Sequence, residues 1–169
     1  AGTRAAIAQF QAALTQADAA IVEEAADKPE LRGMGTTVTM AFQVGAQLCV
    51  VHVGDSRAYL YRDHELHQLT KDHTLVAELV RSGAIQPEQA ARHTMRHVIT
   101  NVVGGPEAGV KVEARALQIE PGDRVLLCSD GLTEMLSNSA IAAILATNGE
   151  PEAACAALIA DANSAGGRD

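Results

Sequence analysis

The pattern of apolar and polar residues predicts a helix in the first part of the chain. Residues 3–26 are rich in alanine. The larger apolar side chains in this range recur at helical spacing at Ile7, Phe10, Leu14, Ile21 and Val22. They form a single apolar stripe, which is typical of an amphipathic helix. The Lys28-Pro29 pair is expected to end it.

A series of short strands is predicted next. Runs rich in β-branched and aromatic residues lie at 36–43, 47–53, 57–62 and 65–69. Gly54-Asp55-Ser56 and Asp63-His64 have the composition of tight turns between the last three runs. Four short strands in succession predict a meander, and therefore an antiparallel sheet.

The second half of the chain alternates helices and strands. Asp72 or Thr74 can cap a helix that runs to about Ser82. Residues from about 84 to 105 predict an irregular, partly helical insertion, and such segments often carry substrate contacts. Further strands are predicted at 110–119 and 124–128, followed by helices at 131–135, 137–147 and 152–162. Ser137 and Ser139 are the candidate caps of the second of these helices. This order predicts an α+β layered domain.

Composition limits the class of function. The 169 residues are enough for one domain with a core, and 47% of them are apolar. Only 2% are aromatic and none is tryptophan, so the chain lacks the stacking platforms of single-stranded nucleic-acid binders. The formal charge of −8 also argues against nucleic-acid binding. The same acidity suits a protein that gathers carboxylates around divalent cations, although many soluble proteins are equally acidic.

Cysteine usage and hydropathy predict a cytoplasmic protein without membrane contact. Cys49, Cys128 and Cys155 form no CxxC pair and have no histidine at zinc spacing. No apolar stretch reaches the roughly 18 residues of a membrane span. No signal peptide is visible, but the chain does not begin with methionine, and its natural start is expected to be missing.

Two aspartates at strand ends are the strongest candidates for chemistry. The runs that end in Gly54-Asp55 and Asp130-Gly131 are both apolar, and a buried strand is a rigid mount for a carboxylate. Hard cations such as Mg²⁺ and Mn²⁺ prefer these oxygen ligands. Asp55 can instead belong to an ordinary hairpin turn, and Asp130 can instead cap the following helix.

Other candidates are weaker. Asp169 ends a glycine-rich loop at the end of the chain, where an aspartate can simply be solvated. A zinc site can be considered at His64 with His67 or at His93 with His97, but no metalloprotease glutamate follows His93. The serines considered as hydrolase nucleophiles lack a nucleophile-elbow motif. They are Ser56 and Ser129.

Five motifs occur in order along the chain. They are Gly33-Met34-Gly35-Thr36-Thr37, Val53-Gly54-Asp55-Ser56-Arg57-Ala58-Tyr59, Leu69-Thr70-Lys71-Asp72-His73-Thr74, Pro121-Gly122-Asp123 with Leu126-Leu127-Cys128-Ser129-Asp130-Gly131-Leu132, and Gly166-Gly167-Arg168-Asp169. Together they resemble the motifs of the bacterial PPM (type 2C) family of metal-dependent serine/threonine protein phosphatases. The resemblance implies a four-layer α-β-β-α sandwich with two central antiparallel sheets. It also implies two Mg²⁺ or Mn²⁺ ions, bridged by a water that attacks phosphoserine or phosphothreonine in proteins. Such phosphatases often oppose serine/threonine kinases, whose substrates are the implied partners.

Site residues carry over by position. Asp130 and Asp169 match the core metal-ligand aspartates of the family, and Asp55 matches an aspartate linked to a third, weaker metal. No catalytic residue beyond the metal ligands is implied. Residues 75–105 match a mobile flap near the substrate groove. The charged flap residues Arg92, Arg96 and His97 either attract phosphopeptide or are simply solvated.

Residues 1–169 are expected to be a single but partial catalytic domain, incomplete at both termini. The phosphate-gripping arginine, the acidic ligand and the Asp-Gly loop of the family's N-terminal strands have no equivalent in residues 1–35, and no asparagine follows Asp169. We therefore expect this piece alone to bind metal poorly and turn over little. The alternative is a pseudophosphatase-like binding module that does not hydrolyse its partner. Self-association of the fragment through exposed strand edges is a further alternative.

Overall fold

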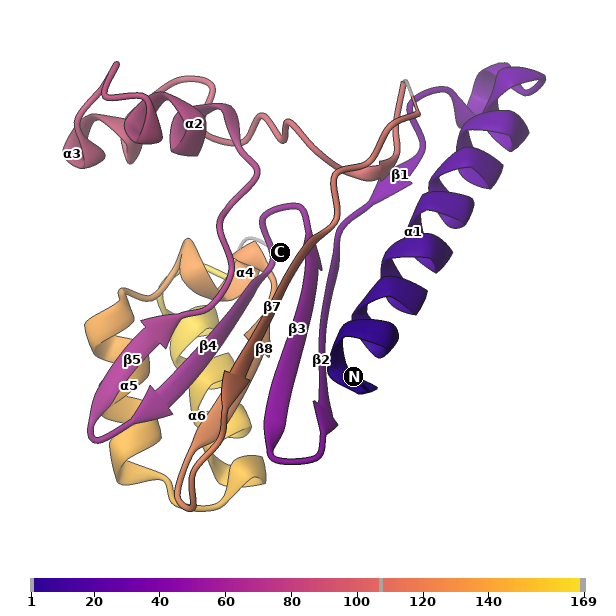
Figure 1. The fold of residues 1–169 in the computed structure, drawn as a ribbon. Coiled ribbons are helices and arrows are strands. Elements are labelled where there is room, and N and C mark those ends of the chain that lie inside the picture. The colour runs from indigo at the N-terminus through magenta and orange to yellow at the C-terminus, as the bar shows by residue number, and fades with distance from the viewer. Residues whose placement is uncertain (1, 107, 168–169) are drawn as a thin grey trace.

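Two antiparallel sheets lie between helices in the computed structural model, which describes residues 2–106 and 108–167 (Figure 1). In chain order the elements are α1 (Gly2–Ala26), the short helix η1 (Pro29–Leu31), β1 (Gly35–Thr36), β2 (Val38–Val44), β3 (Gln47–Val53), β4 (Arg57–Arg62), β5 (Glu65–Gln68), α2 (Leu75–Arg81), α3 (Pro87–Ala90), β6 (Val103–Gly104), β7 (Glu113–Gln118), β8 (Arg124–Cys128), α4 (Asp130–Thr133), α5 (Asn138–Thr147) and α6 (Pro151–Ser164).

Each main sheet has three strands in the described part of the chain. The first has the order β2-β3-β7 and the second has the order β5-β4-β8. In the first sheet Val51 of β3 lies opposite Met40 of β2 and Ala114 of β7. In the second, Ala58 of β4 lies opposite Leu127 of β8. The central strands β3 and β4 are consecutive in the sequence, so the chain crosses from one sheet to the other between them.

Apolar side chains fill the space between the layers. Between the sheets, the buried cluster consists of Leu48, Val50, Ala58, Leu60 and Leu69. Between the second sheet and the helices α5 and α6, it consists of Tyr61, Ile141, Leu145, Ala154 and Leu158. Full burial of each large aliphatic side chain stabilises the fold by about 1.5–3 kcal/mol. On the other side, α1 covers the first sheet, and the rings of Phe10 and Phe42 lie 4.6 Å apart (Figure 1). The predicted four-layer sandwich is confirmed.

One carboxylate inside α1 is almost completely buried. Asp18 is 2% exposed, and it accepts hydrogen bonds from the backbone N–H groups of Gly104 at 2.7 Å, Gly109 at 2.8 Å and Val110 at 3.1 Å. Burial by itself would raise the pKa of Asp18, but the three N–H donors outweigh it and hold the pKa below its usual value. Asp18 therefore ties the outer helix to the end of β6 and to the loop that follows it.

The prediction of a single four-stranded meander is wrong. The hairpins β2-β3 and β4-β5 form as expected, but they belong to different sheets. Both β3 and β4 are almost entirely buried, because each is covered on one face by the other sheet and on the other face by helices. Strands that are buried on both faces do not alternate between apolar and polar residues, so their sequences do not indicate which strands share a sheet.

The segment after β5 leaves the sandwich and forms α2 and α3, which project beyond the ends of the strands (Figure 1). Thr74 rather than Asp72 caps α2, accepting from the Ala77 N–H at 3.3 Å. The chain then returns through β6, which pairs with β1; these two-residue strands were not predicted, because they are too short for a sequence pattern. In the described residues, no helix combines the length and hydrophobicity that a membrane crossing requires.

Candidate metal and phosphate site

Asp55 and Asp130 come together at one end of the sandwich. Asp55 lies in the connection between β3 and β4, and Asp130 is the first residue of α4, directly after β8. Both are half-buried and both line one open cavity of about 530 Å³. The other lining residues are Arg57, Asp72, Thr74, Val76, Ala77, Ala90, Ala91, Arg96, Thr133, Glu134 and Met135. The cavity therefore combines the two strand-end carboxylates with α2 and α3.

The ordinary structural roles considered for these aspartates do not apply. Asp55 is not in a hairpin turn, because β3 and β4 lie in different sheets. Asp130 does not cap α4 either, because the capping position belongs to Ser129 and no side chain forms a cap hydrogen bond there. Neither carboxylate is explained by the local geometry of the turn or helix that contains it.

The carboxylates of the cavity repel one another. Burial raises the pKa of Asp55 above its usual value, the Asp130 carboxylate raises it further, and Asp72 adds a smaller effect in the same direction. A hydrogen bond from the backbone of Asp55 itself and, more weakly, the charge of Arg57 lower the pKa of Asp55, but they do not outweigh these effects. An acidic group with a raised pKa is stabilised when a cation binds beside it, because the cation relieves both desolvation and like-charge repulsion.

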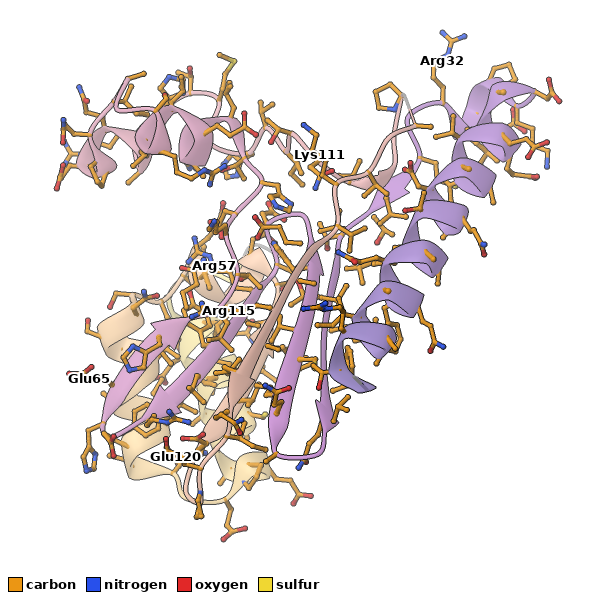
Figure 2. All side chains as sticks on the ribbon, in the orientation of Figure 1. Arg32, Arg57, Glu65, Lys111, Arg115 and Glu120 are labelled. Atoms are coloured by element: carbon orange, nitrogen blue, oxygen red, sulfur yellow. The ribbon has the colours of Figure 1, made fainter. Side chains whose placement is uncertain are left out.

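Arg57 and Asp72 form an ion pair at the edge of the cavity. Nε and Nη2 of Arg57 donate to the two carboxylate oxygens of Asp72 at 2.8 and 2.5 Å, and Nη1 donates to the Tyr59 hydroxyl at 3.0 Å. Burial opposes the charge, but the hydrogen bonds to Asp72 raise the pKa of Arg57 above its usual value. Figure 2 shows Arg57 at the end of the sandwich that faces α2. With its donors engaged in this way, Arg57 fixes the chain on either side of the cavity.

The carboxylate oxygens of the cavity fit a hard divalent cation, but few candidate ligands lie among the residues that the structure describes. Asp55 and Asp130 supply the carboxylate oxygens that Mg²⁺ and Mn²⁺ prefer. Asp169, the third predicted ligand, lies outside the described residues. Within residues 2–106 and 108–167, no group of three or more His, Cys, Asp or Glu side chains is placed to hold a metal ion. Two candidate ligands for one site are therefore visible.

The charged residues of the predicted flap occupy different positions. Arg96 lines the cavity, whereas Arg92 does not. Nδ1 of His97 lies 2.8 Å from Oε1 of Glu134, which links this segment to the chain just after α4. Nδ1 of His93 accepts from the Met95 N–H. These contacts give the histidines local roles, and the structure does not gather them into a zinc site within its described residues.

Comparison with known proteins gives a consistent set of relatives. The profile of the Protein phosphatase 2C family matches residues 2–158. The serine/threonine protein phosphatase PstP of Mycobacterium tuberculosis is 43% identical over 135 residues, which are 80% of this chain and 26% of that protein. The serine/threonine phosphatase stp of Listeria monocytogenes is 39% identical over 149 residues, 88% of this chain and 59% of the relative. This chain thus spans only part of the length of both.

Solved structures agree with these sequences. The crystal structure of the Mycobacterium tuberculosis phosphatase PstP/Ppp matches with a TM-score of 0.88 at 39% identity, over 96% of this chain and 68% of that one. A second structure holds the catalytic domain of PstP in complex with 2 manganese ions. It matches with a TM-score of 0.84 at 39% identity, over 96% of this chain and 67% of that one.

Proposed function

The chain belongs to the protein phosphatase 2C family, and from this premise we propose that it forms part of the catalytic domain of a protein-serine/threonine phosphatase. The proposed reaction is hydrolysis of phosphoserine and phosphothreonine in proteins, dependent on Mg²⁺ or Mn²⁺. The convergence of Asp55 and Asp130 in one cavity is the observation that carries the proposal. The binding of manganese by the PstP catalytic domain supports the choice of metal.

Each residue has a separate role in this proposal. Asp130 and Asp169 hold two core cations, and Asp55 contributes to a third, weaker position beside Asp130. When bound, such cations lower the pKa of water and neutralise charge on the phosphoryl oxygens. Arg57 stays paired with Asp72, and this ion pair keeps the chain segments around the cavity in place. Arg96 is the cationic side chain placed to attract the phosphate, because it lines the same cavity.

The direct test is manganese-dependent hydrolysis of a small aryl phosphate and of a phosphothreonine peptide. The protein is assayed at its native length, with Asp130→Asn beside it. We expect the variant to lose most of the activity, because it removes a charged ligand without changing the shape of the site. Wild-type activity in the variant would contradict the assignment of Asp130. For residues 1–169 alone we expect weak metal binding, because Asp72 and Glu134, two of the four described carboxylates that line the cavity, are already paired with Arg57 and His97.

A second candidate is a binding module that keeps the fold and recognises a phosphorylated partner without hydrolysis. The observation in its favour is that no group of three or more metal-ligating side chains is found among the described residues. The two candidates differ in one measurement. A binding module retains a phosphopeptide with and without manganese and releases no inorganic phosphate, whereas the enzyme releases phosphate when manganese is added.

We further propose that residues 75–105 act as a flap over the cavity within one domain, since α2 and α3 contribute Val76, Ala77, Ala90 and the neighbouring Ala91 to its lining. The family acts on phosphorylated proteins, and we propose that the substrates of this member come from a serine/threonine kinase. A cytoplasmic setting fits its three free cysteines, which a reducing compartment keeps as thiols.

Self-association through strand edges is also proposed. In the described residues β8 pairs with β4 alone, and its Val125 and Leu127 are 41% and 43% exposed. Ile159 of α6 is 62% exposed, and the helix lines a groove together with the same strand. An unpaired strand edge with apolar neighbours is a template for pairing with another chain. Light scattering at increasing concentration tests this: a dimer that Leu127→Lys disrupts supports it, and a monomer at all concentrations refutes it.

A further inference from the structure

His73 holds the residue that immediately precedes Asp55 through both of that residue's backbone polar groups. The N–H of His73 donates to the carbonyl oxygen of Gly54 at 2.8 Å, and the N–H of Gly54 donates to Nδ1 of His73 at 3.0 Å. Gly54 has a φ of +109°, and a Cβ there would lie 2.3 Å from Cγ2 of Thr37. The peptide before Asp55 is therefore confined to one conformation and fixed by one side chain.

Asn101 determines which nitrogen of the His73 ring carries the proton. Nδ2 of Asn101 donates to the carbonyl oxygen of Lys111 at 2.8 Å, and Oδ1 accepts from the Lys111 N–H at 2.9 Å, which sets the orientation of the amide. Nδ2 therefore also faces Nδ1 of His73 as a donor, at 2.9 Å. A ring nitrogen that accepts from two N–H groups carries no proton. The proton lies on Nε2, which is 3.8 Å from Oε1 of Glu113.

The His73 ring is enclosed on its remaining sides. His73 is 8% exposed, and its ring lies 4.9 Å from that of His52, measured between centroids. His52 is 2% exposed, and its Nε2 donates to the carbonyl oxygen of Lys71 at 3.1 Å. The backbone oxygen of His73 accepts from the Thr100 N–H at 2.8 Å. The residue thus joins the Gly54 turn to the segment that returns from α3.

The residue before His73 holds the other flank of the same turn. The Asp72 carboxylate binds Arg57, which follows Asp55 by two positions, through two parallel hydrogen bonds. The consecutive residues Asp72 and His73 therefore grip positions 54 and 57, with Asp55 between them. Bidentate pairs of this kind fix geometry as well as adding energy.

We propose that His73 is a positioning residue for the metal site: its Nδ1 orients the Gly54 peptide and thereby holds the Asp55 carboxylate toward Asp130. The role rests on the proposed function, because it assumes that Asp55 and Asp130 bind a divalent cation. It goes beyond the ligands themselves, since His73 is not among the residues that line the cavity. Partners that orient metal ligands typically change metal affinity about 10–100-fold when they are mutated.

Two substitutions separate positioning from a general packing role. Asparagine places an amide oxygen near the position of Nδ1, where it can accept from the Gly54 N–H, whereas glutamine reaches toward the position of Nε2. Both remove the ring and its contact with His52. His67→Gln is the matched control, because the His67 side chain is half exposed on β5 and lies outside the cavity. Thermal unfolding shows whether each variant is folded.

The readout is Mn²⁺ affinity, measured on the protein at its native length by the electron paramagnetic resonance of free Mn²⁺, with Asp130→Asn as reference. We expect His73→Gln to weaken binding about 10–100-fold, and His73→Asn and His67→Gln to bind as the parent does. If Asp130→Asn weakens binding and His73→Gln does not, the positioning role is refuted while the proposed function stands. Equal loss in the Asn and Gln variants refutes it in favour of packing. If Asp130→Asn changes nothing, the proposed function fails as well.

Discussion

The replacement of Asp18 by alanine tests how α1 is attached to the rest of the fold. A hydrogen bond to a charged carboxylate contributes about 1.5–3 kcal/mol, and an N–H left buried without a partner costs about 1–3 kcal/mol. Gly104 is buried, so the loss of its bond carries the full cost, whereas Gly109 is exposed and its N–H regains water. Alanine recovers about 0.5 kcal/mol of helix propensity. With about 1.5–3 kcal/mol from Gly104, smaller contributions from Gly109 and Val110, and the helix propensity subtracted, the expected loss of unfolding free energy is about 2–4 kcal/mol.

The assay is urea unfolding followed by circular dichroism, because the chain has no tryptophan. The folded pKa of Asp18 lies below the unfolded value of about 3.9. The unfolded state therefore binds the proton first as the pH falls, and the stabilisation is present above that pH and lost through the folded pKa. The difference between parent and variant should be large at pH 7 and shrink below about pH 4.

Glu23→Ala is the matched control for this prediction. Glu23 lies on the same helix and is exposed. Its substitution should change the unfolding free energy by no more than about 0.5 kcal/mol. A loss below about 1 kcal/mol for Asp18→Ala at pH 7 would refute the reasoning, because it would mean that the three N–H groups find equivalent partners without the carboxylate.

Three other outcomes are expected. Asp55→Asn should weaken Mn²⁺ binding and, in chelator, raise the melting temperature of the protein. The pKa of Asp55 is raised in the folded state, so its charged form destabilises the fold as the pH rises above about 4. A lower melting temperature for the variant in chelator would contradict this. Arg96→Ala should raise KM for a phosphopeptide about fivefold, because an ion pair in an open site contributes at most about 1 kcal/mol. Arg92→Ala is the control and should leave KM unchanged, because Arg92 does not line the cavity. Burial, with a contribution from His73, lowers the pKa of His52, so the urea midpoint should fall as the pH drops below about 6.5; His52→Gln should reduce this dependence.

The sequence predicted those elements whose signals are local. The helix predicted at 3–26 is Gly2–Ala26, and the strands at 47–53, 57–62 and 124–128 have the predicted bounds. In each case an apolar run is bounded by turn residues. The run and the turn residues lie within a few positions of each other in the sequence, so they can be recognised without knowledge of the fold. The first β-rich run and the one at 110–119 are shifted or shortened in the structure, to Val38–Val44 and Glu113–Gln118. Element ends depend more on partner strands than the central residues do.

Contacts between distant segments were harder to predict. Asp18 lies four residues after Leu14 and three before Ile21, so it stands on the apolar stripe that identified the helix. A carboxylate at such a position indicates a buried polar contact, but its partners lie 86 to 92 residues away. His73 belongs to a motif that resembles the family, yet nothing in its local sequence predicts a bond to Gly54.

The antiparallel pairing of β4 with β8 is what brings the candidate ligands together. Arg57 of β4 lies opposite Cys128 of β8. Asp55 lies two positions before Arg57 and Asp130 lies two positions after Cys128, so both aspartates leave this strand pair at the same end. The Asp130 carboxylate is then near enough to raise the pKa of Asp55. The repulsion that destabilises this pair without metal is thus a direct consequence of the topology, and a divalent cation is the group that reverses it.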